Sequence, residues 1–499
     1  MTDELLSLSA RQIASNIANR SINASEVIAE YLKRIETVNP VVNAICTLNP
    51  AVESDAADCD RRLGEGELAR PLEGVPFVVK DTIETKGVRT TFGSRIMEDN
   101  VPSEDAVAVE RLKAAGAILL GKTNTPEFAT DVNTTNAIFG MTRNPWNLNA
   151  TAGGSSGGTG AALAAGLAPI GLGTDLGGSI RIPASFNGVV GLRPAPGRVP
   201  VYPQAFGWDT LVAHVCGPMA QRVEDVGLVL AAVAGPDDRD PGSLPTEGYE
   251  YAEAAKPESV MTDRSIAFAG DLNGLVPVDP EVLQLCRDAC GTFQDLGCSV
   301  EADCFDVSEV PDIISGTRAF NMVARYADRL DSFREIMSKS LVNQVEPSLR
   351  VEVRAVAKAE RLRTVYWHRV REFLKTYDYI VTPTIGVSAF RLDQPLPTEV
   401  GGVKVDRFYD VLLSTYAFSI TGLPIISIPC GWTGAGLPVG LQIVGPRLRE
   451  DLVLTAAGNF ARLHPEFFKL PEIDLESAKP IHQDFLDTFS KFVGSAARL

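Results

Sequence analysis

The chain has 499 residues, of which 45% are hydrophobic and 22% charged, an ordinary composition for a globular protein. Its length exceeds that of a typical single domain, although α/β enzymes with large sheets can use such a length as one unit. The net charge of −17 argues against a nucleic-acid partner, since phosphate backbones are bound through lysine and arginine.

The first residues, MTDELLSLSARQ, are polar and acidic and lack the basic and apolar regions of a signal peptide. No apolar run is long enough to span a membrane. Eight cysteines are too few for a disulfide framework, and the spacing of Cys286 and Cys290 favours packing on one helix face over a zinc site. We therefore expect a cytoplasmic protein with no membrane contact and no metal.

Two helices are predicted near the N-terminus, one opened by a capping box at Ser9–Gln12 and one over 25–37 with a single apolar stripe. Residues 1–65 are therefore expected to form a helical arm packed on a core made by 66–499. In this core, strands are predicted near 75–79, 117–121, 168–173, 265–270, 378–382, 425–429 and 439–444. Helices are predicted over 105–115, 157–166, 279–296, 345–376 and 450–462. This alternation predicts an α/β fold with a central twisted, mixed and largely parallel sheet covered by helices on both faces.

Residues 116–123 read GAILLGKT and match the phosphate-loop pattern GxxxxGK[ST]. The four middle residues form a hydrophobic strand, however, and cannot be the loop that surrounds a phosphate. Pro126 also interrupts the helix that should follow. We expect no nucleotide site here.

Residues 153–183 hold two glycine-flanked serines, Ser155 and Ser179, 24 residues apart. Glycines beside a serine let the backbone N–H groups of a turn approach a bound atom, and such a turn binds the anion that forms beside a nucleophile. A serine nucleophile needs a base. The histidines of the chain are His214, His368, His464 and His482. None of them stands in a motif with a glycine turn or a carboxylate partner.

The better candidate for the base is Lys80, which ends the apolar run of GVPFVVKD (74–81). A buried strand that ends in lysine delivers the amine to the edge where α/β sheets carry ligands. A lysine base must be neutral, and burial lowers the pKa of lysine from its ordinary 10.4. A helix beginning near Gly157 would also disfavour the ammonium. Arg181 could also disfavour the ammonium, but we favour a role for it as a strut of the glycine turn. Asp81 is expected on the opposite face of the strand from Lys80.

Several further segments complete a recognisable pattern. They are GKTNTPEFA (121–129), FGMTRNPWN (139–147), GGSSGG (153–158), GTDLGGSIRIPASFNGVVGLRPAPGRVP (173–200), YDYIVTPT (377–384), GLPIISIPCG (422–431) and GLPVGLQIVGP (436–446). In order and spacing, from about residue 66 onward, the chain resembles the amidase signature family. The resemblance implies the amidase-signature fold for 66–499 and amide hydrolysis without a cofactor or metal.

The resemblance also implies a Ser–cis-Ser–Lys catalytic set on Ser179, Ser155 and Lys80. Ser179 would attack the amide carbonyl and form an acyl-enzyme. Ser155, after a cis Gly154–Ser155 peptide bond, would relay a proton between Ser179 and Lys80 and then to the departing nitrogen.

The other site residues follow from the same resemblance. The oxyanion hole is expected on the backbone N–H groups of Leu176, Gly177, Gly178 and Ser179. We expect glycine at 177 and 178 because a side chain there would block the carbonyl oxygen. Supporting roles are expected for Ser156, Asp175 and Arg181. Ala129 would offer its backbone beside the acyl pocket, next to Ser155.

We therefore predict a serine amidohydrolase that cleaves a small or aryl carboxamide, extending to an anilide or carbamate. Its partner is a small-molecule amide, and a homodimer is left open. Substrate recognition is expected in 201–210, which contains Tyr202, Phe206 and Trp208, and in 318–326.

Two alternatives remain open. One is the glutaminase A subunit of a glutamyl-tRNA amidotransferase, which shares all these motifs. Its glutamine-binding segment typically reads RRIxxGTxxLS followed by GYYDAYY, and residues 348–360 (SLRVEVRAVAKAE) depart from that pattern. The weaker alternative is an α/β-hydrolase-type esterase with Ser155 as nucleophile, because 153–157 also match GxSxG. That motif needs a buried strand directly before it, and 144–152 are polar and turn-rich.

Overall fold

A computed structural model describes residues 5–203, 214–256, 261–394, 396–405 and 408–475. At its centre lies an eleven-stranded sheet. The strands of this sheet are β1 (Ile45–Leu48), β2 (Pro76–Lys80), β3 (Ile118–Thr123), β8 (Ile170–Asp175), β9 (Val190–Arg193), β10 (Val215–Ala220), β11 (Ser265–Phe268), β12 (Ser299–Ala302), β13 (Tyr379–Pro383), β16 (Ile425–Trp432) and β17 (Pro438–Val444). Their order across the sheet is β1-β3-β2-β8-β10-β9-β16-β17-β13-β11-β12.

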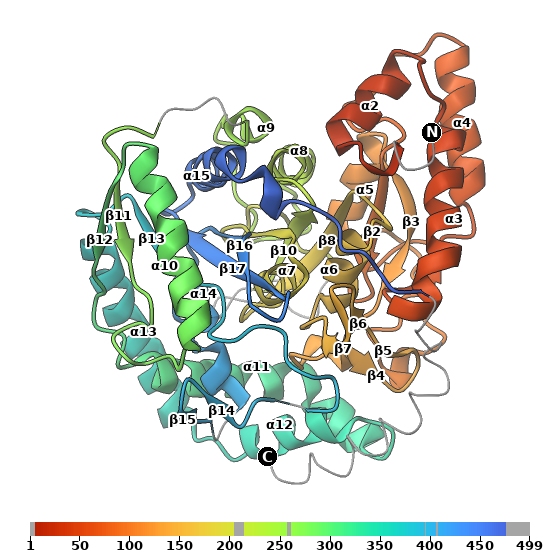
Figure 1. The fold of residues 1–499 in the computed structure, drawn as a ribbon. Helices are drawn as coiled ribbons and strands as arrows, with labels where there is room; N and C mark the ends of the chain where they lie inside the picture. The colour runs from red at the N-terminus through yellow and green to blue at the C-terminus, as the bar shows by residue number, and fades with distance from the viewer. Residues whose placement is uncertain (1–4, 204–213, 257–260, 395, 406–407, 476–499) are drawn as a thin grey trace.

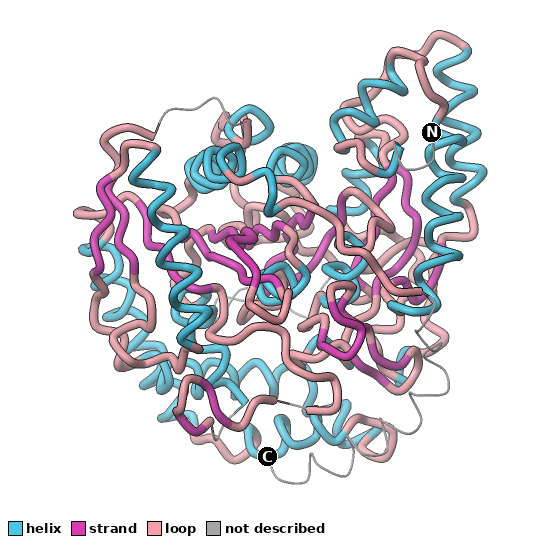
Figure 2. The backbone as a smooth tube through the Cα atoms, in the orientation of Figure 1, coloured by secondary structure: helices cyan, strands magenta, loops and turns pink. Residues whose placement is uncertain are grey.

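Helices cover both faces of this sheet (Figures 1 and 2). The α-helices are α2 (Ala10–Ala18), α3 (Ala24–Val42), α4 (Val52–Gly64), α5 (Val107–Ala114), α6 (Gly157–Ala164), α7 (Arg181–Asn187), α8 (Val223–Val233), α9 (Tyr251–Ala254), α10 (Pro280–Asp295), α11 (Val310–Phe333), α12 (Lys339–Ser348), α13 (Val353–Phe373), α14 (Leu413–Ser419) and α15 (Glu450–Leu463). In the part of the chain that the structure describes, three small hairpins lie outside the main sheet: β4 (Thr135–Asn136) with β5 (Gly140–Met141), β6 (Arg143–Asn144) with β7 (Asn147–Thr151), and β14 (Glu399–Val400) with β15 (Val403–Lys404). No helix in the described ranges is long and apolar enough to cross a membrane.

The α/β class and the mixed sheet are confirmed, but the sheet is not largely parallel. The antiparallel neighbours are β1–β3, β8–β10, β9–β10, β9–β16, β16–β17 and β13–β17. The parallel neighbours are β2–β3, β2–β8, β11–β13 and β11–β12. A strand buried on both faces reads as a continuous apolar run, and such a run carries no information on strand direction.

The predicted strands all exist, at β2, β3, β8, β11, β13, β16 and β17. The helix predicted over 345–376 is two helices, because α12 ends just after Pro347 and α13 begins at Val353. Residues 118–123 form the fully buried β3, so GAILLGKT is not a phosphate loop, as predicted.

The N-terminal segment forms helices α2, α3 and α4, and Ser9 makes the predicted capping box with Gln12. The same segment also supplies β1, which pairs with β3 at the edge of the main sheet. The apolar residues of α3, including Tyr31 and Ile35, belong to the same core cluster as β2 and β8. The predicted arm therefore contributes an edge strand as well as helices.

Two short helices approach the sheet closely where its residues are glycines. A Cβ at Gly173 in β8 would lie 2.9 Å from Ser156 Oγ, and one at Gly440 in β17 would lie 2.6 Å from Ser185 in α7. At Gly171 in β8, a Cβ would lie 2.8 Å from Thr159 in α6. These positions leave no room for a side chain. The start of α6 is therefore held against β8, and α7 is held against β17.

Candidate active site

Lys80 is the last residue of β2 and is fully buried. Its Nζ lies 2.6 Å from Ser155 Oγ and 2.8 Å from Thr174 Oγ1, both within hydrogen-bond distance. Asp81 turns away, as predicted, and its Oδ2 accepts a hydrogen bond from Thr91 Oγ1 at 2.6 Å. The fold therefore brings the predicted base and the predicted relay serine into direct contact.

Burial of Lys80 lowers its pKa from 10.5 to about 7, against the opposing charge of Asp175. About half of the molecules would then carry a neutral amine at pH 7. Arg181 is not among the charges that act on this pKa, so burial accounts for the shift.

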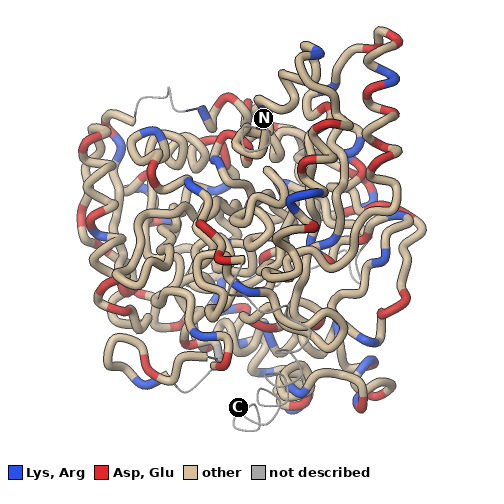
Figure 3. Tube along the Cα trace, turned by 45° about the vertical axis from the view of Figure 1, so that its right-hand side comes forward, with Lys and Arg blue, Asp and Glu red and all other residues tan. Residues whose placement is uncertain are grey.

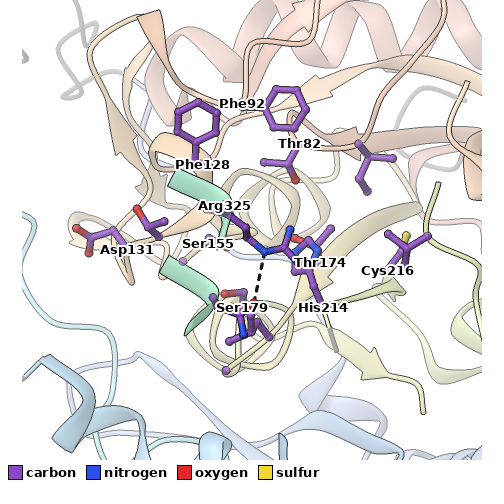
Figure 4. Close-up of a pocket in the computed structure, with 18 of the residues that line it drawn as sticks. Thr82, Phe92, Phe128, Asp131, Ser155, Thr174, Ser179, His214, Cys216 and Arg325 are labelled. Atoms are coloured by element: carbon purple, nitrogen blue, oxygen red, sulfur yellow. Dashed lines mark hydrogen bonds between the residues drawn. The ribbon is translucent and has the colours of Figure 1, made fainter. Parts of the chain in front are cut away.

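Ser155 follows a cis Gly154–Ser155 peptide bond, as the resemblance implies. The Ser155 side chain is buried, whereas Ser179 is partly exposed. The backbone N–H of Ser156 donates to the Ser179 carbonyl at 3.0 Å, so the two serine-bearing turns lie side by side. Ser156 Oγ bridges to the Thr174 backbone at 3.3 Å, which fixes the turn to β8. Both predicted catalytic serines line one cavity (Figure 4).

Asp175 and Arg181 form the buried base of the second turn. Arg181 Nε and Nη2 each donate to the Asp175 carboxylate at 3.0 Å, and Arg193 Nε lies 3.4 Å away from it. Burial alone would raise the pKa of Asp175, but the two arginines hold it well below its ordinary value. Arg181 also donates to the Thr415 carbonyl at 3.0 Å. Arg181 therefore connects Asp175 to α14, and its role as a strut for the turn stays a prediction.

The predicted oxyanion hole needs one correction. The N–H of Gly178 donates to Asp175 Oδ1 at 2.9 Å and is therefore not available to a substrate. Within the described part of the chain, the N–H groups of Leu176, Gly177 and Ser179 donate to no protein acceptor. These three residues line the cavity, so they are the remaining candidates for oxyanion binding.

The reason for glycine at 177 and 178 also differs from our expectation. A Cβ at Gly177 would overlap the ring of Tyr416, and one at Gly178 would lie 2.6 Å from Thr415 Oγ1. Gly178 also has a φ of +120°, which L side chains rarely adopt. These glycines are required by α14 packed behind the turn rather than by the approach of a carbonyl oxygen.

The cavity has a volume of about 380 Å³ and an aromatic wall. Phe92 and Phe128 lie 6.1 Å apart between ring centroids, and Phe128 and Tyr326 lie 5.5 Å apart. Ala129, next to Phe128, also lines the cavity. Of the predicted recognition segments, α11 contributes Arg318, Asn321, Met322, Arg325 and Tyr326, and the first segment contributes Val201 and Tyr202. Phe206 and Trp208 lie outside the described residues.

His214 is a cavity residue that sequence reasoning missed. Burial, together with the charges of Arg325 and Lys80, lowers its pKa from 6.5 to about 3, so its imidazole is neutral at physiological pH. The one sequence signal for the place of His214 was the apolar run directly after it, which forms β10. His368 is exposed on α13, His464 bonds to Thr292 and Glu466, and His482 lies outside the described residues.

The esterase alternative finds no support in this geometry. Ser155 bonds to Lys80, and among the described residues no histidine makes a hydrogen bond with Ser155 or Ser179. The strand before GxSxG is β7, which pairs with β6 in a small hairpin and not in the main sheet. A nucleophile elbow needs the opposite arrangement.

The Amidase family model matches residues 26–454. This chain belongs to the amidase family. It is 37% identical to an acylamidase of Rhodococcus erythropolis over 476 residues, which cover 94% of the chain and 98% of that protein. It is 34% identical to the glutamyl-tRNA(Gln) amidotransferase A subunit of Geobacter metallireducens, covering 92% of the chain and 97% of that relative.

Among solved structures, a bacterial aryl acylamidase of the amidase signature family superposes on this amidase with a TM-score of 0.86 at 27% identity. The match covers 95% of the chain and 99% of that structure. These findings confirm the family that the motifs predicted. The amidase is therefore a hydrolase of amide C–N bonds.

The buried ion pair of this amidase leads to a stability prediction. Asp175→Asn should lower the free energy of unfolding by about 3–5 kcal/mol, because Arg181 and Arg193 would be left without their buried counter-charge. Urea unfolding at pH 7 measures this loss. The control is Asp225→Asn, a buried carboxylate that accepts from the N–H groups of Ala10 and Arg11. That variant should lose about 1 kcal/mol. Equal losses in both variants would contradict the role given to Asp175.

Proposed function

We propose that this amidase cleaves small or aryl carboxamides, including anilides and carbamates, through an acyl-enzyme on Ser179. The observation that carries the proposal is the 2.6 Å contact between Lys80 Nζ and Ser155 Oγ in a fully buried setting. That setting lowers the pKa of Lys80 to about 7, so a neutral amine is available to take a proton.

In the first half of the reaction, neutral Lys80 takes the proton of Ser155 while Ser155 takes the proton of Ser179. Ser179 Oγ then forms a bond to the amide carbonyl carbon, and the negative charge that develops on the carbonyl oxygen is met by the N–H groups of Leu176, Gly177 and Ser179. The proton returns from Lys80 through Ser155 to the nitrogen, the C–N bond breaks, and the amine leaves. A water molecule then attacks the acyl-enzyme, with its proton carried along the same relay, and releases the acid.

The aromatic wall of the cavity supports an aryl group in the proposed substrate. Phe92, Phe128 and Tyr326 offer ring faces to an aryl group, worth about 0.5–1.5 kcal/mol per ring pair beyond simple burial. The similarity to an acylamidase and to an aryl acylamidase points in the same direction. We propose that the enzyme is cytoplasmic and that its binding partner is the small amide substrate. The homodimer stays a prediction.

The second candidate is the amidotransferase glutaminase, since the Geobacter relative is nearly as similar to this chain as the acylamidase. Residues 348–360, which span the end of α12 and the start of α13, depart from the glutamine-binding pattern of those glutaminases. We therefore place the partner-dependent activity second.

The two candidates differ in what the purified chain does alone. We expect it to release 4-nitroaniline from p-nitroacetanilide without any partner protein, followed by absorbance. Ammonia release from glutamine should be at least tenfold slower. Glutamine hydrolysis without anilide hydrolysis would favour the glutaminase and contradict our proposal.

A further inference from the structure

Three arginines of α11 point to one face of the helix. Arg318, Arg325 and Arg329 are seven and four residues apart, which at 100° per residue places them within a 40° sector. All three line the cavity that holds Ser155 and Ser179. We call these three residues the arginine stripe.

The acidic groups that line the cavity have cations other than Arg329 beside them. The described lining residues include two carboxylates, Glu84 and Asp131. Each already has a cation of its own nearby, since the charge of Lys122 acts on Glu84 and that of Arg318 acts on Asp131. Asp131 also accepts a hydrogen bond from Ser340 Oγ at 2.8 Å.

Arg329 is the arginine of the stripe on which the argument for a ligand rests. Its Nη1 donates to the Arg325 carbonyl at 2.9 Å, and its guanidinium lies 5.1 Å from the ring centroid of Phe128. Within the described ranges no carboxylate lies at ion-pair distance from it. Arg369, by contrast, is a partly buried arginine that does have a carboxylate partner, Glu309, at 2.6 Å.

A cavity-lining arginine such as Arg329, without a carboxylate at ion-pair distance among the described residues, contrasts with the net charge of −17 of the chain. Acidic and basic residues are interspersed along the outer segments (Figure 3). Inside the cavity the positive field reaches neighbouring groups, because the charge of Arg325 contributes, after burial, to the low pKa of His214. The Arg325 side chain extends into the space near Ser179 and His214 (Figure 4).

We propose that the arginine stripe makes this amidase selective for acidic aryl amides, in which a carboxylate is attached to the aromatic group. The proposal rests on the proposed function. A guanidinium matches a carboxylate through two parallel hydrogen bonds, and Arg329 presents this fork beside Phe128 of the aromatic wall. The ring of the substrate would pack on that wall while its carboxylate meets Arg329, with Arg325 adding charge nearer to Ser179.

Matched substrate pairs test this selectivity on the purified enzyme. One pair is acetanilide and 4-acetamidobenzoate, with the carboxylate on the amine side. The other pair is benzamide and 4-carboxybenzamide, with the carboxylate on the acyl side. In the pair that is hydrolysed faster, we expect the acidic member to have at least a tenfold higher kcat/KM, mainly through a lower KM. A preference for the neutral member in both pairs would overturn the proposal.

The variant Arg329→Gln removes the charge and keeps a polar side chain. We expect it to reduce the acidic-to-neutral ratio of kcat/KM at least tenfold, and Arg329→Lys to recover part of the ratio. The matched control is Arg361→Gln, on the exposed side of α13, which should leave the ratio unchanged. An unchanged ratio in Arg329→Gln would overturn the role of the stripe.

A measurement on the wild-type protein covers the case in which the variant does not fold. Raising NaCl from 0.05 to 0.5 M should lower kcat/KM for the acidic member several-fold and leave the neutral member within twofold. Equal salt effects on both members would count against the proposal. If neutral and acidic anilides are hydrolysed equally well, this inference fails and the proposed function stands. If the enzyme hydrolyses no amide at all, both the inference and the proposed function fail.

Discussion

Replacing Ser179 with alanine is expected to lower kcat/KM for p-nitroacetanilide by roughly 10⁴-fold or more. The variant keeps Lys80, Ser155 and the oxyanion N–H groups, but no oxygen remains to form the acyl-enzyme. The fold should be intact, because the side chain of Ser179 makes no hydrogen bond within the described residues and sits partly exposed. Initial rates, together with thermal unfolding of both proteins, measure the two effects.

The matched control is Ser185→Ala, a buried serine on α7 outside the cavity. Ser185 Oγ accepts from the Gly440 N–H at 2.9 Å, so this variant should lose about 1–3 kcal/mol of stability and retain most of its activity. A fluorophosphonate probe should label the wild type on Ser179, as located by peptide mass, and fail to label Ser179→Ala. Labelling of Ser155 in that variant would mean that Ser155 is the nucleophile and would contradict our assignment.

Local sequence patterns were sufficient to predict the core of the site, because its parts come from motifs that carry their own signal. Lys80 ends a strand that is recognisable by its apolar run. Ser155 and Ser179 stand in glycine turns, and the structure holds both turns against β8 through the close fit of Ser156 and Ile180 on Gly173. Short-range patterns therefore singled out Lys80 and Ser155, which the structure brings into contact, while their roles as base and relay stay predictions.

Other parts of the site depend on contacts between distant segments and were not predictable from local patterns. Tyr416 and Thr415 explain the glycines at 177 and 178, yet they lie more than 230 residues further along the chain. The capture of the Gly178 N–H by Asp175 needs the geometry of a particular turn. His214 lines the cavity because β10 pairs with β8, a pairing that periodicity does not reveal.

The same limit applies to the sheet as a whole. Strands β9, β10 and β16 are linked by antiparallel pairing, although they are as buried as β2, which pairs in parallel with both of its neighbours. The sequence of an edge strand such as β1 is short and half exposed, so it is easily taken for a loop. The apolar runs therefore predicted seven strands of the main sheet. They did not predict the buried central strands β9 and β10 or the edge strands β1 and β12, and they did not predict strand direction.

Replacing Lys80 with methionine is expected to lower kcat/KM by roughly 10³-fold or more, because the proton relay loses its base. In the wild type, kcat/KM should rise tenfold per pH unit below about pH 7 and level off above it. The sign follows from the chemistry, since the protonated amine is inactive and the pKa of Lys80 is lowered to about 7. A pH–rate profile from pH 5 to 9 measures this. A profile without an acid limb between pH 6 and 8 would contradict the assignment of Lys80 as the base.

The same substitution, Lys80→Met, should raise the free energy of unfolding at neutral pH, because burying a lysine that must stay neutral destabilises the wild type. Folding lowers the pKa of Lys80 from 10.5 to about 7, so the unfolded chain binds more protons between these values and stability rises with pH. At pH 7 this penalty amounts to about 4 kcal/mol, and at pH 10 it falls below about 1 kcal/mol. Methionine removes the penalty but also removes the hydrogen bonds to Ser155 and Thr174, worth about 1 kcal/mol each. Urea unfolding should therefore show Lys80→Met to be more stable than the wild type by roughly 2 kcal/mol at pH 7 and less stable by about 1 kcal/mol at pH 10. A variant that is less stable at both pH values would mean that the amine is not held neutral by burial, and the base proposed for the reaction would then be charged when it is needed.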